Sequence, residues 1–167
     1  DVYKRQCLRE VGGKLDFFST DLQTLSGLDH LTSVAGPISI FSNALLQRVD
    51  GLNGLSAAWL QIHDNYALEE IGGLRSLSQG SFNIYENANL RSMRGQTSLT
   101  HLIDLYIRAS PALTDLDGLS SVTTVSTVSI SASALRDLTG LRSLSQADYL
   151  IIEQCDSLPN LAGLSEL

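Results

Sequence analysis

The side chains that could carry chemistry are few and scattered along the chain. Three histidines occur, at His30, His63 and His101, and two cysteines, at Cys7 and Cys155. A zinc site needs a full set of such ligands at short, fixed spacings. Nucleophilic catalysis needs a nucleophile, a base and an orienting group in reach of one another. The sequence shows neither pattern, so we expect no catalytic residue, no metal ligand and no cofactor, and we predict that the chain is not an enzyme.

Paired carboxylates are the other candidates for acid–base chemistry, and they belong to a longer series of charges. The series runs Arg48, Glu69/Glu70, Arg91/Arg94, Asp115/Asp117 and Arg136/Asp137. The sign alternates until the mixed last pair, and successive members lie at similar positions of units about 22 residues long. We therefore interpret the series as facing charges on stacked units, which discriminate against a slip by one unit. An acidic substrate site is the alternative.

The composition excludes several classes of protein. The net charge of −7 has the wrong sign for binding nucleic acid phosphates. With 43% apolar and only 17% charged residues, the chain is not intrinsically disordered. No apolar run approaches the ~18 residues of a membrane span, so we expect no membrane insertion within this sequence.

A short apolar-x-apolar triplet recurs at nearly constant spacing. The triplets are Leu15-Asp16-Phe17, Ile38-Ser39-Ile40, Leu60-Gln61-Ile62, Phe82-Asn83-Ile84, Leu105-Tyr106-Ile107, Val128-Ser129-Ile130 and Leu150-Ile151-Ile152. Alternation over three residues is typical of a short strand with two side chains pointing inward. One such strand cannot bury its apolar face alone, so successive units must stack and pair their triplets in a parallel sheet.

The repeat predicts a right-handed β-solenoid with coils of 22–23 residues, one parallel sheet face and irregular return loops. Residues 7–167 form a single solenoid of about seven coils. A helical bundle, the competing reading of so many leucines, does not fit, because no stretch sustains an apolar stripe of helical period.

Two positions outside the triplet also repeat. A small or polar residue follows five places after each triplet begins, in the series Thr20, Asn43, Asn65, Asn87, Ser110, Ser133 and Cys155. The asparagines are expected to bond backbone groups of the neighbouring coil, a ligand-binding role being the alternative. A glycine then precedes an apolar return, as at Gly27, Gly73, Gly118 and Gly140, and we expect it to adopt a positive φ at a corner.

The repeat unit, Gly-x-apolar-x-Ile-x-x-Asn-x-x-Leu-x-x-apolar-x-Gly-Leu-x-x-Leu, resembles the receptor L-domain family, a relative of the leucine-rich repeats. Residues 36–55 and 60–77 show the unit best, and Asn65-Tyr66-Ala67-Leu68 has the longer Asn-to-Leu spacing of that family. The similarity extends over about residues 7–167, without the family's flanking cysteine-rich modules. It implies a recognition domain that is extracellular or at the cell surface, as in growth-factor receptors and fungal cell-wall glycoproteins.

Both ends of the sequence are predicted to lie in mid-coil, so we expect a solenoid truncated at both ends. Residues 1–6 fit no repeat position and are interpreted as a non-native scar. Cys7 and Cys155 would lie about six coils apart, roughly 29 Å, too far for a disulfide. Cys155 is predicted to be a small buried core residue.

The residues that flank each inward pair point away from the core and form the outward face of the sheet. The residue after each triplet gives one ladder over five coils: Phe18, Phe41, His63, Tyr85 and Arg108. Trp59 and Tyr106 flank this ladder. Exposed aromatic residues with arginine are typical binding anchors, so we predict that these seven residues bind a protein or glycan partner. The alternative is that the ladder only stabilises the stack.

Three functions remain open at this point. The first is a non-enzymatic recognition module of a cell-surface or secreted protein. The second is a structural or adhesive repeat segment, and the third is the extracellular part of a receptor kinase. The flanking reading frame would separate them. A Phe41→Ser, Tyr85→Ser variant is expected to lose partner binding with little change in melting temperature if the first is right.

Overall fold

The computed structural model describes residues 8–167, so the predictions for residues 1–6 and for Cys7 lie outside the described residues. The strands of the large sheet are β2 (Leu15–Phe18), β4 (Ile38–Phe41), β6 (Ala57–His63), β8 (Gln79–Tyr85), β9 (His101–Ser110), β10 (Thr124–Ser133) and β11 (Gln146–Glu153). The shorter elements are β1 (Glu10–Val11), β3 (Ser33–Val34), β5 (Arg48–Val49), β7 (Glu70–Ile71) and the 3₁₀ helices η1 (Asp117–Leu119) and η2 (Thr139–Leu141).

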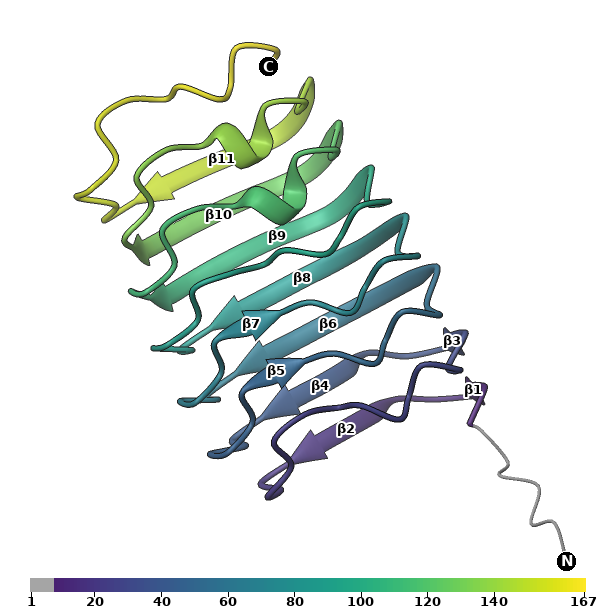
Figure 1. The fold of residues 1–167 in the computed structure, drawn as a ribbon. Coiled ribbons are helices and arrows are strands. Elements are labelled where there is room, and N and C mark those ends of the chain that lie inside the picture. Colours follow the sequence, from purple (N-terminus) through teal and green to yellow (C-terminus); the bar gives the residue numbers. More distant parts are fainter. Residues whose placement is uncertain (1–7) are drawn as a thin grey trace, which may run out of the picture.

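The predicted solenoid is confirmed as a parallel β-solenoid of about seven coils. The large sheet has the order β11-β10-β9-β8-β6-β4-β2, so each coil lies beside the next one in the sequence (Figure 1). All its neighbouring strands are parallel, and the inward triplet residues pair across every junction, for example Ile40 with Ile62 and Ile84 with Ile107. The period of the sequence therefore gave the register as well as the fold class.

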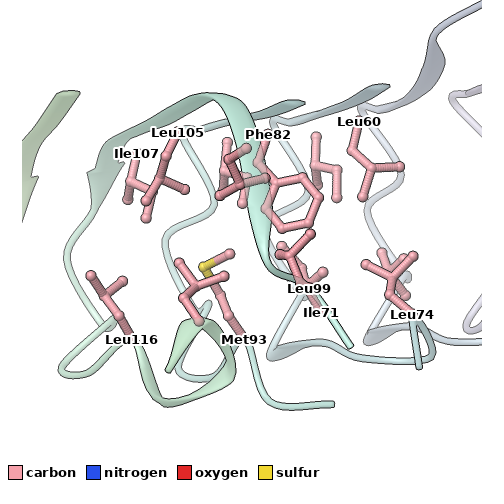
Figure 2. Close-up of a cluster of buried hydrophobic side chains, with 14 of the residues drawn as sticks. Leu60, Ile71, Leu74, Phe82, Met93, Leu99, Leu105, Ile107 and Leu116 are labelled. Carbon is pink, nitrogen blue, oxygen red and sulfur yellow. The ribbon is translucent and has the colours of Figure 1, made fainter. Parts of the chain in front are cut away.

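The core is a column of apolar side chains between the sheet and the return segments. Figure 2 shows Leu60, Phe82 and Leu105 from the strands facing residues such as Leu74 and Leu99 from the return path. These side chains are fully or almost fully buried. Burial of each such side chain is worth about 1.5–3 kcal/mol, and no coil could achieve it without its neighbours.

At or next to the C-terminal end of each strand of the large sheet, one residue that is not glycine has a left-handed backbone conformation. The φ angles lie between 49° and 57° at Ser19, Ser42, Asp64, Glu86, Ala109, Ala132 and Gln154. This conformation costs roughly 1 kcal/mol for a residue with a Cβ. It turns the chain out of the strand and leaves backbone carbonyls that the next side chain can bond.

Asn43, Asn65 and Asn87, which form the asparagine column, bond these backbone carbonyl oxygens, as predicted. The Nδ2 of Asn65 donates to the carbonyl oxygens of Ile40 and His63, both at 2.9 Å, while its Oδ1 accepts from the backbone N–H of Asn43 at 3.1 Å. Asn43 and Asn87 repeat the pattern and are likewise fully buried. The column is therefore a set of backbone contacts between coils.

The expectation of positive φ at the return glycines is right for Gly27 and Gly73 and wrong for Gly118 and Gly140. The latter two lie in η1 and η2, which have ordinary φ angles. Glycine is needed at these two positions because there is no room for a side chain. A Cβ on Gly118 would collide with the carbonyl oxygen of Met93, and a Cβ on Gly140 with the carbonyl oxygen of Leu116. In these coils glycine permits close approach of the preceding coil instead of an unusual φ.

Candidate binding face

The outward face of the large sheet carries the predicted ladder in register. Phe18 pairs with Phe41, Phe41 with His63, His63 with Tyr85, and Tyr85 with Arg108. The first four side chains stack face to face, with ring centroids 4.5, 4.9 and 4.4 Å apart and interplanar angles of 26°, 16° and 7°. The ring spacing follows the spacing of the strands, because each ring stands on its own strand.

This stacking decides which part of each ring a ligand can reach. The faces of Phe41 and His63 are occupied by neighbouring rings, so these residues present only ring edges to solvent. Phe18, at the end of the stack, is 57% exposed. The ladder residues therefore stabilise one another, each pair contributing about 0.5–1.5 kcal/mol beyond the buried area, and few ring faces remain for a partner.

His63 is held in the ladder by an acidic neighbour. Its Nδ1 lies 2.9 Å from Oδ2 of Asp64, and the hydroxyl of Tyr66 donates to Oδ1 of the same carboxylate at 3.4 Å. The hydrogen bond with His63 is the main reason why the pKa of Asp64 lies below its ordinary value. Burial, followed by the charges of Asp64 and Glu86, raises the pKa of Tyr85. These carboxylates line the ladder on one side.

Trp59 lies beside the ladder, near the start of the strands, and is 51% exposed. It forms one wall of a hollow of about 660 Å³ whose floor includes Ala58 and Gly80. The opposite side includes Ile103, an extra residue on β9 that leaves a register shift between β8 and β9. The side chain of Ile103 is 65% exposed. This first hollow is mainly apolar.

Tyr106 and Arg108 line a second hollow near the ends of the strands. Its volume is about 680 Å³, and its lining also includes Asn83, Tyr85, Glu86, Ser129, Ser131, Glu153 and Gln154. Arg108 is exposed. The second hollow is mainly polar. Of the predicted site residues, Trp59 thus lines the first hollow, Tyr85, Tyr106 and Arg108 line the second, and Phe18, Phe41 and His63 line neither.

The charge series pairs only in part. Arg48 lies 3.5 Å from Glu70, and Arg94 lies 2.7 Å from Asp117 and 3.9 Å from Asp115. These pairs join adjacent coils, as the alternating signs predicted. Because they are exposed, each contributes at most about 1 kcal/mol, and within residues 8–167 the other members of the series form no ion pair.

The remaining candidates for chemistry stay apart. Among the described residues, no three His, Cys, Asp or Glu side chains come close enough to hold a metal ion. His30 and His101 are exposed, and His63 is half-buried in the ladder. Cys155 occupies the asparagine position of its coil, with Sγ 3.3 Å from the carbonyl oxygen of Glu153. It is half-buried and not fully buried as expected, because β11 is an edge strand of the sheet.

The two hollows were not predicted from the sequence. The second arises where β10 presents serine at two successive outward positions, Ser129 and Ser131, between larger side chains on β9 and β11. That signal is visible in the aligned triplets as two successive small residues. The first depends on the extra residue on β9, which a spacing of 23 instead of 22 between Phe82 and Leu105 indicates without placing it.

Comparison of the chain with protein-family models, with curated proteins and with solved structures finds no match. Within residues 8–167, no helix has the length and apolar character to cross a membrane.

Proposed function

We propose that the chain is a non-enzymatic recognition module that binds a protein or glycan partner through the outward face of its large sheet. One observation carries the proposal. The face of seven parallel strands is flanked by two hollows, and their walls include Trp59 and Tyr106, whose rings stack on no other ring among the described residues. Exposed aromatic residues beside concave surface are typical binding anchors.

The receptor L-domain relationship and a location outside the cell or at its surface are part of this proposal. They rest on the resemblance of the repeat unit, in particular the long spacing from Asn65 to Leu68 and the paired Gly and Leu of the return path. The solenoid architecture is compatible with both.

A structural or adhesive segment is the second candidate, and the three stacked ring pairs favour it. If the ladder only stabilises the stack, removing an exposed ring from the face should abolish no binding. The two candidates therefore differ in whether an exposed, unstacked ring contributes to the binding of a partner.

The test compares variants of the two kinds of ring. Trp59→Ala and Tyr106→Ala remove exposed rings and should leave the melting temperature nearly unchanged. Phe41→Ser breaks the stack and, contrary to the expectation from the sequence, should lower the melting temperature, because both faces of the Phe41 ring are in contact with other rings. The binding of each variant is measured on an array of defined glycans and on immobilised ectodomains of surface proteins. Loss of a binding signal in Trp59→Ala or Tyr106→Ala supports recognition. A binding signal that both variants retain, but that a return-path variant such as Arg91→Ala loses, contradicts it.

A further inference from the structure

The ladder ends at Arg108 on β9, and the next position, on β10, leaves a space of the size of one ring. The ladder position there is Ser131, which pairs with Arg108 on one side and Glu153 on the other. Two strand spacings separate Arg108 from Glu153, roughly 9.6 Å. A planar group needs about 3.5–4 Å to a neighbour on each of its faces. One ring therefore fits between β9 and β11 above the serine.

The neighbouring outward position repeats this arrangement. Ser129 pairs with Tyr106 on one side and Ile151 on the other. Tyr106 is 38% exposed and stacks on no ring within residues 8–167. Its negative π face is available to partially positive C–H groups of a ligand. The second hollow thus has an aromatic wall on β9 and a floor of two hydroxyl groups on β10.

The polar side chains of this hollow have unused hydrogen-bonding capacity. Asn83, Tyr106, Arg108, Glu153 and Gln154 line it, and within the described part of the chain none of their side-chain polar atoms has a hydrogen-bond partner. The first hollow differs, because its Ser81 hydroxyl already donates to Asp104 at 3.3 Å. Burying such groups under an apolar ring would cost free energy for each one left unpaired. The ligand must therefore offer many donors and acceptors around a ring.

The charges of the second hollow narrow the chemical class of the ligand further. Arg108 stands between Glu86 and Glu153, so the lining holds one positive and two negative side chains. The two carboxylates disfavour an acidic ligand such as a uronic acid, and Arg108 offsets part of their attraction for a cationic one. Amide, carboxylate and guanidinium groups are planar and can each bond two adjacent hydroxyl groups.

We propose that the hollow above Ser129 and Ser131 binds a neutral pyranose unit of a glycan. One face of the sugar lies against Tyr106, and its hydroxyl groups bond Arg108 and Glu153. This inference rests on the proposed function, because it assigns the ligand class for one part of the same face. The mainly apolar hollow beside Trp59 is outside this site.

The experiment uses the 167-residue chain and two serines on the same strand. Ser131→Phe fills the second hollow, and Ser126→Phe, in the lining of the first hollow, is the matched control. The probes are neutral gluco-, galacto-, manno- and xylo-oligosaccharides, with polygalacturonate as the acidic probe. Binding is measured by calorimetry, and the fluorescence of Trp59, the one tryptophan, reports on the first hollow.

We expect binding of at least one neutral oligosaccharide, weakened about tenfold or more by Ser131→Phe and by less than about twofold by Ser126→Phe, with unchanged tryptophan fluorescence. Ser131→Phe places its ring between Arg108 and Glu153 and should change the melting temperature little. If this variant does not fold, Tyr106→Ala, which removes bulk only, should show the same loss of binding.

Three results would overturn the inference. Binding lost in Ser126→Phe but kept in Ser131→Phe would move the sugar to the first hollow and leave the proposed function standing. Preference for polygalacturonate would exclude a neutral ligand. Binding of a surface-protein ectodomain through this face, without binding of any glycan, would also refute the sugar site while supporting recognition.

Discussion

The first four coils and the last three use equivalent positions in different ways. In the first four, the ladder position carries rings that stack, and three of the four column positions carry buried asparagines. In the last three, the ladder continues as Arg108, Ser131 and Glu153, and the column as Ser110, Ser133 and Cys155. At the ladder and column positions the first region thus makes internal contacts, whereas the second leaves its outward ladder side chains without a stacking partner.

The difference teaches that one backbone repeat can serve two purposes. The sheet, the register and the left-handed corners continue through all seven coils. Side chains that contact each other add stability, and side chains without an internal partner can contact a ligand. We therefore expect substitutions at the ladder and column positions of the first region to lower stability, and substitutions at the ladder positions of the second to change binding.

The largest expected contrast lies in the column. Asn65→Ala removes the Nδ2 donor to the carbonyl oxygens of Ile40 and His63 and the Oδ1 acceptor of the Asn43 N–H, and we expect it to lower the free energy of unfolding by about 3 kcal/mol. Ser110→Ala removes one bond of 3.3 Å to the carbonyl oxygen of Arg108, and should cost about 1 kcal/mol. Urea unfolding measures both. Asn89→Ala, at an exposed asparagine, is the control, and equal losses at 65 and 110 would refute the contrast.

Among the return glycines, we expect the larger loss of stability in the last coils and the smaller loss in the first. Gly118→Ala places a Cβ against the carbonyl oxygen of Met93, and we expect a loss of about 2–3 kcal/mol. Gly27 has φ 106° but open space around a Cβ, so Gly27→Ala should cost only about 1–2 kcal/mol. Thermal unfolding of the two variants compares them. A smaller effect at Gly118 would mean that the last coils tolerate separation from their neighbours.

Within the ladder, Phe41→Ser removes two ring contacts and should lower the free energy of unfolding by about 2 kcal/mol. Arg108→Ser should change it by less than about 0.5 kcal/mol, because no ion pair holds this side chain among the described residues. Chemical denaturation followed by circular dichroism measures both values. Similar losses would show that Arg108 is a further rung of the stack.

The smallest expected effect is a pH dependence of the free energy of unfolding, which arises from Asp64 in the first region. Because the folded pKa of Asp64 is lowered, its contribution is present above the ordinary value of 3.8 and disappears as the pH falls through the folded value. Asp64→Asn keeps a residue that tolerates the left-handed conformation. It should reduce stability by less than about 1 kcal/mol at neutral pH.

That difference between wild type and Asp64→Asn should vanish at pH about 2, as urea midpoints at the two pH values will show. Gln154→Asn, at the equivalent corner of the last coil, is the uncharged control, and its effect should not depend on pH. A stability difference that persists at acid pH would show that Asp64 stabilises the left-handed corner itself, and not the fold through its bond with His63.

The sequence predicts those features of this fold that depend on period, and misses those that depend on local geometry. The triplets placed Phe41 beside His63 correctly, because a fixed repeat determines which residues pair. They did not show that the two rings would occupy each other's faces, since that depends on side-chain rotamers. The left-handed corners were also missed, because residues such as Glu86 and Ala132 carry no signal for a positive φ.

The identical segments at residues 74–79 and 141–146 lie at equivalent points of their coils, 67 residues apart. Each strand of the large sheet pairs only with strands of the adjacent coils, as is usual for stacked repeats. Recombination of the gene between the two segments would therefore delete or duplicate three whole turns and keep every remaining triplet in register. The number of coils can therefore change in evolution without a new core. The number of stacked rings, and of ladder positions without a stacked ring, changes with it.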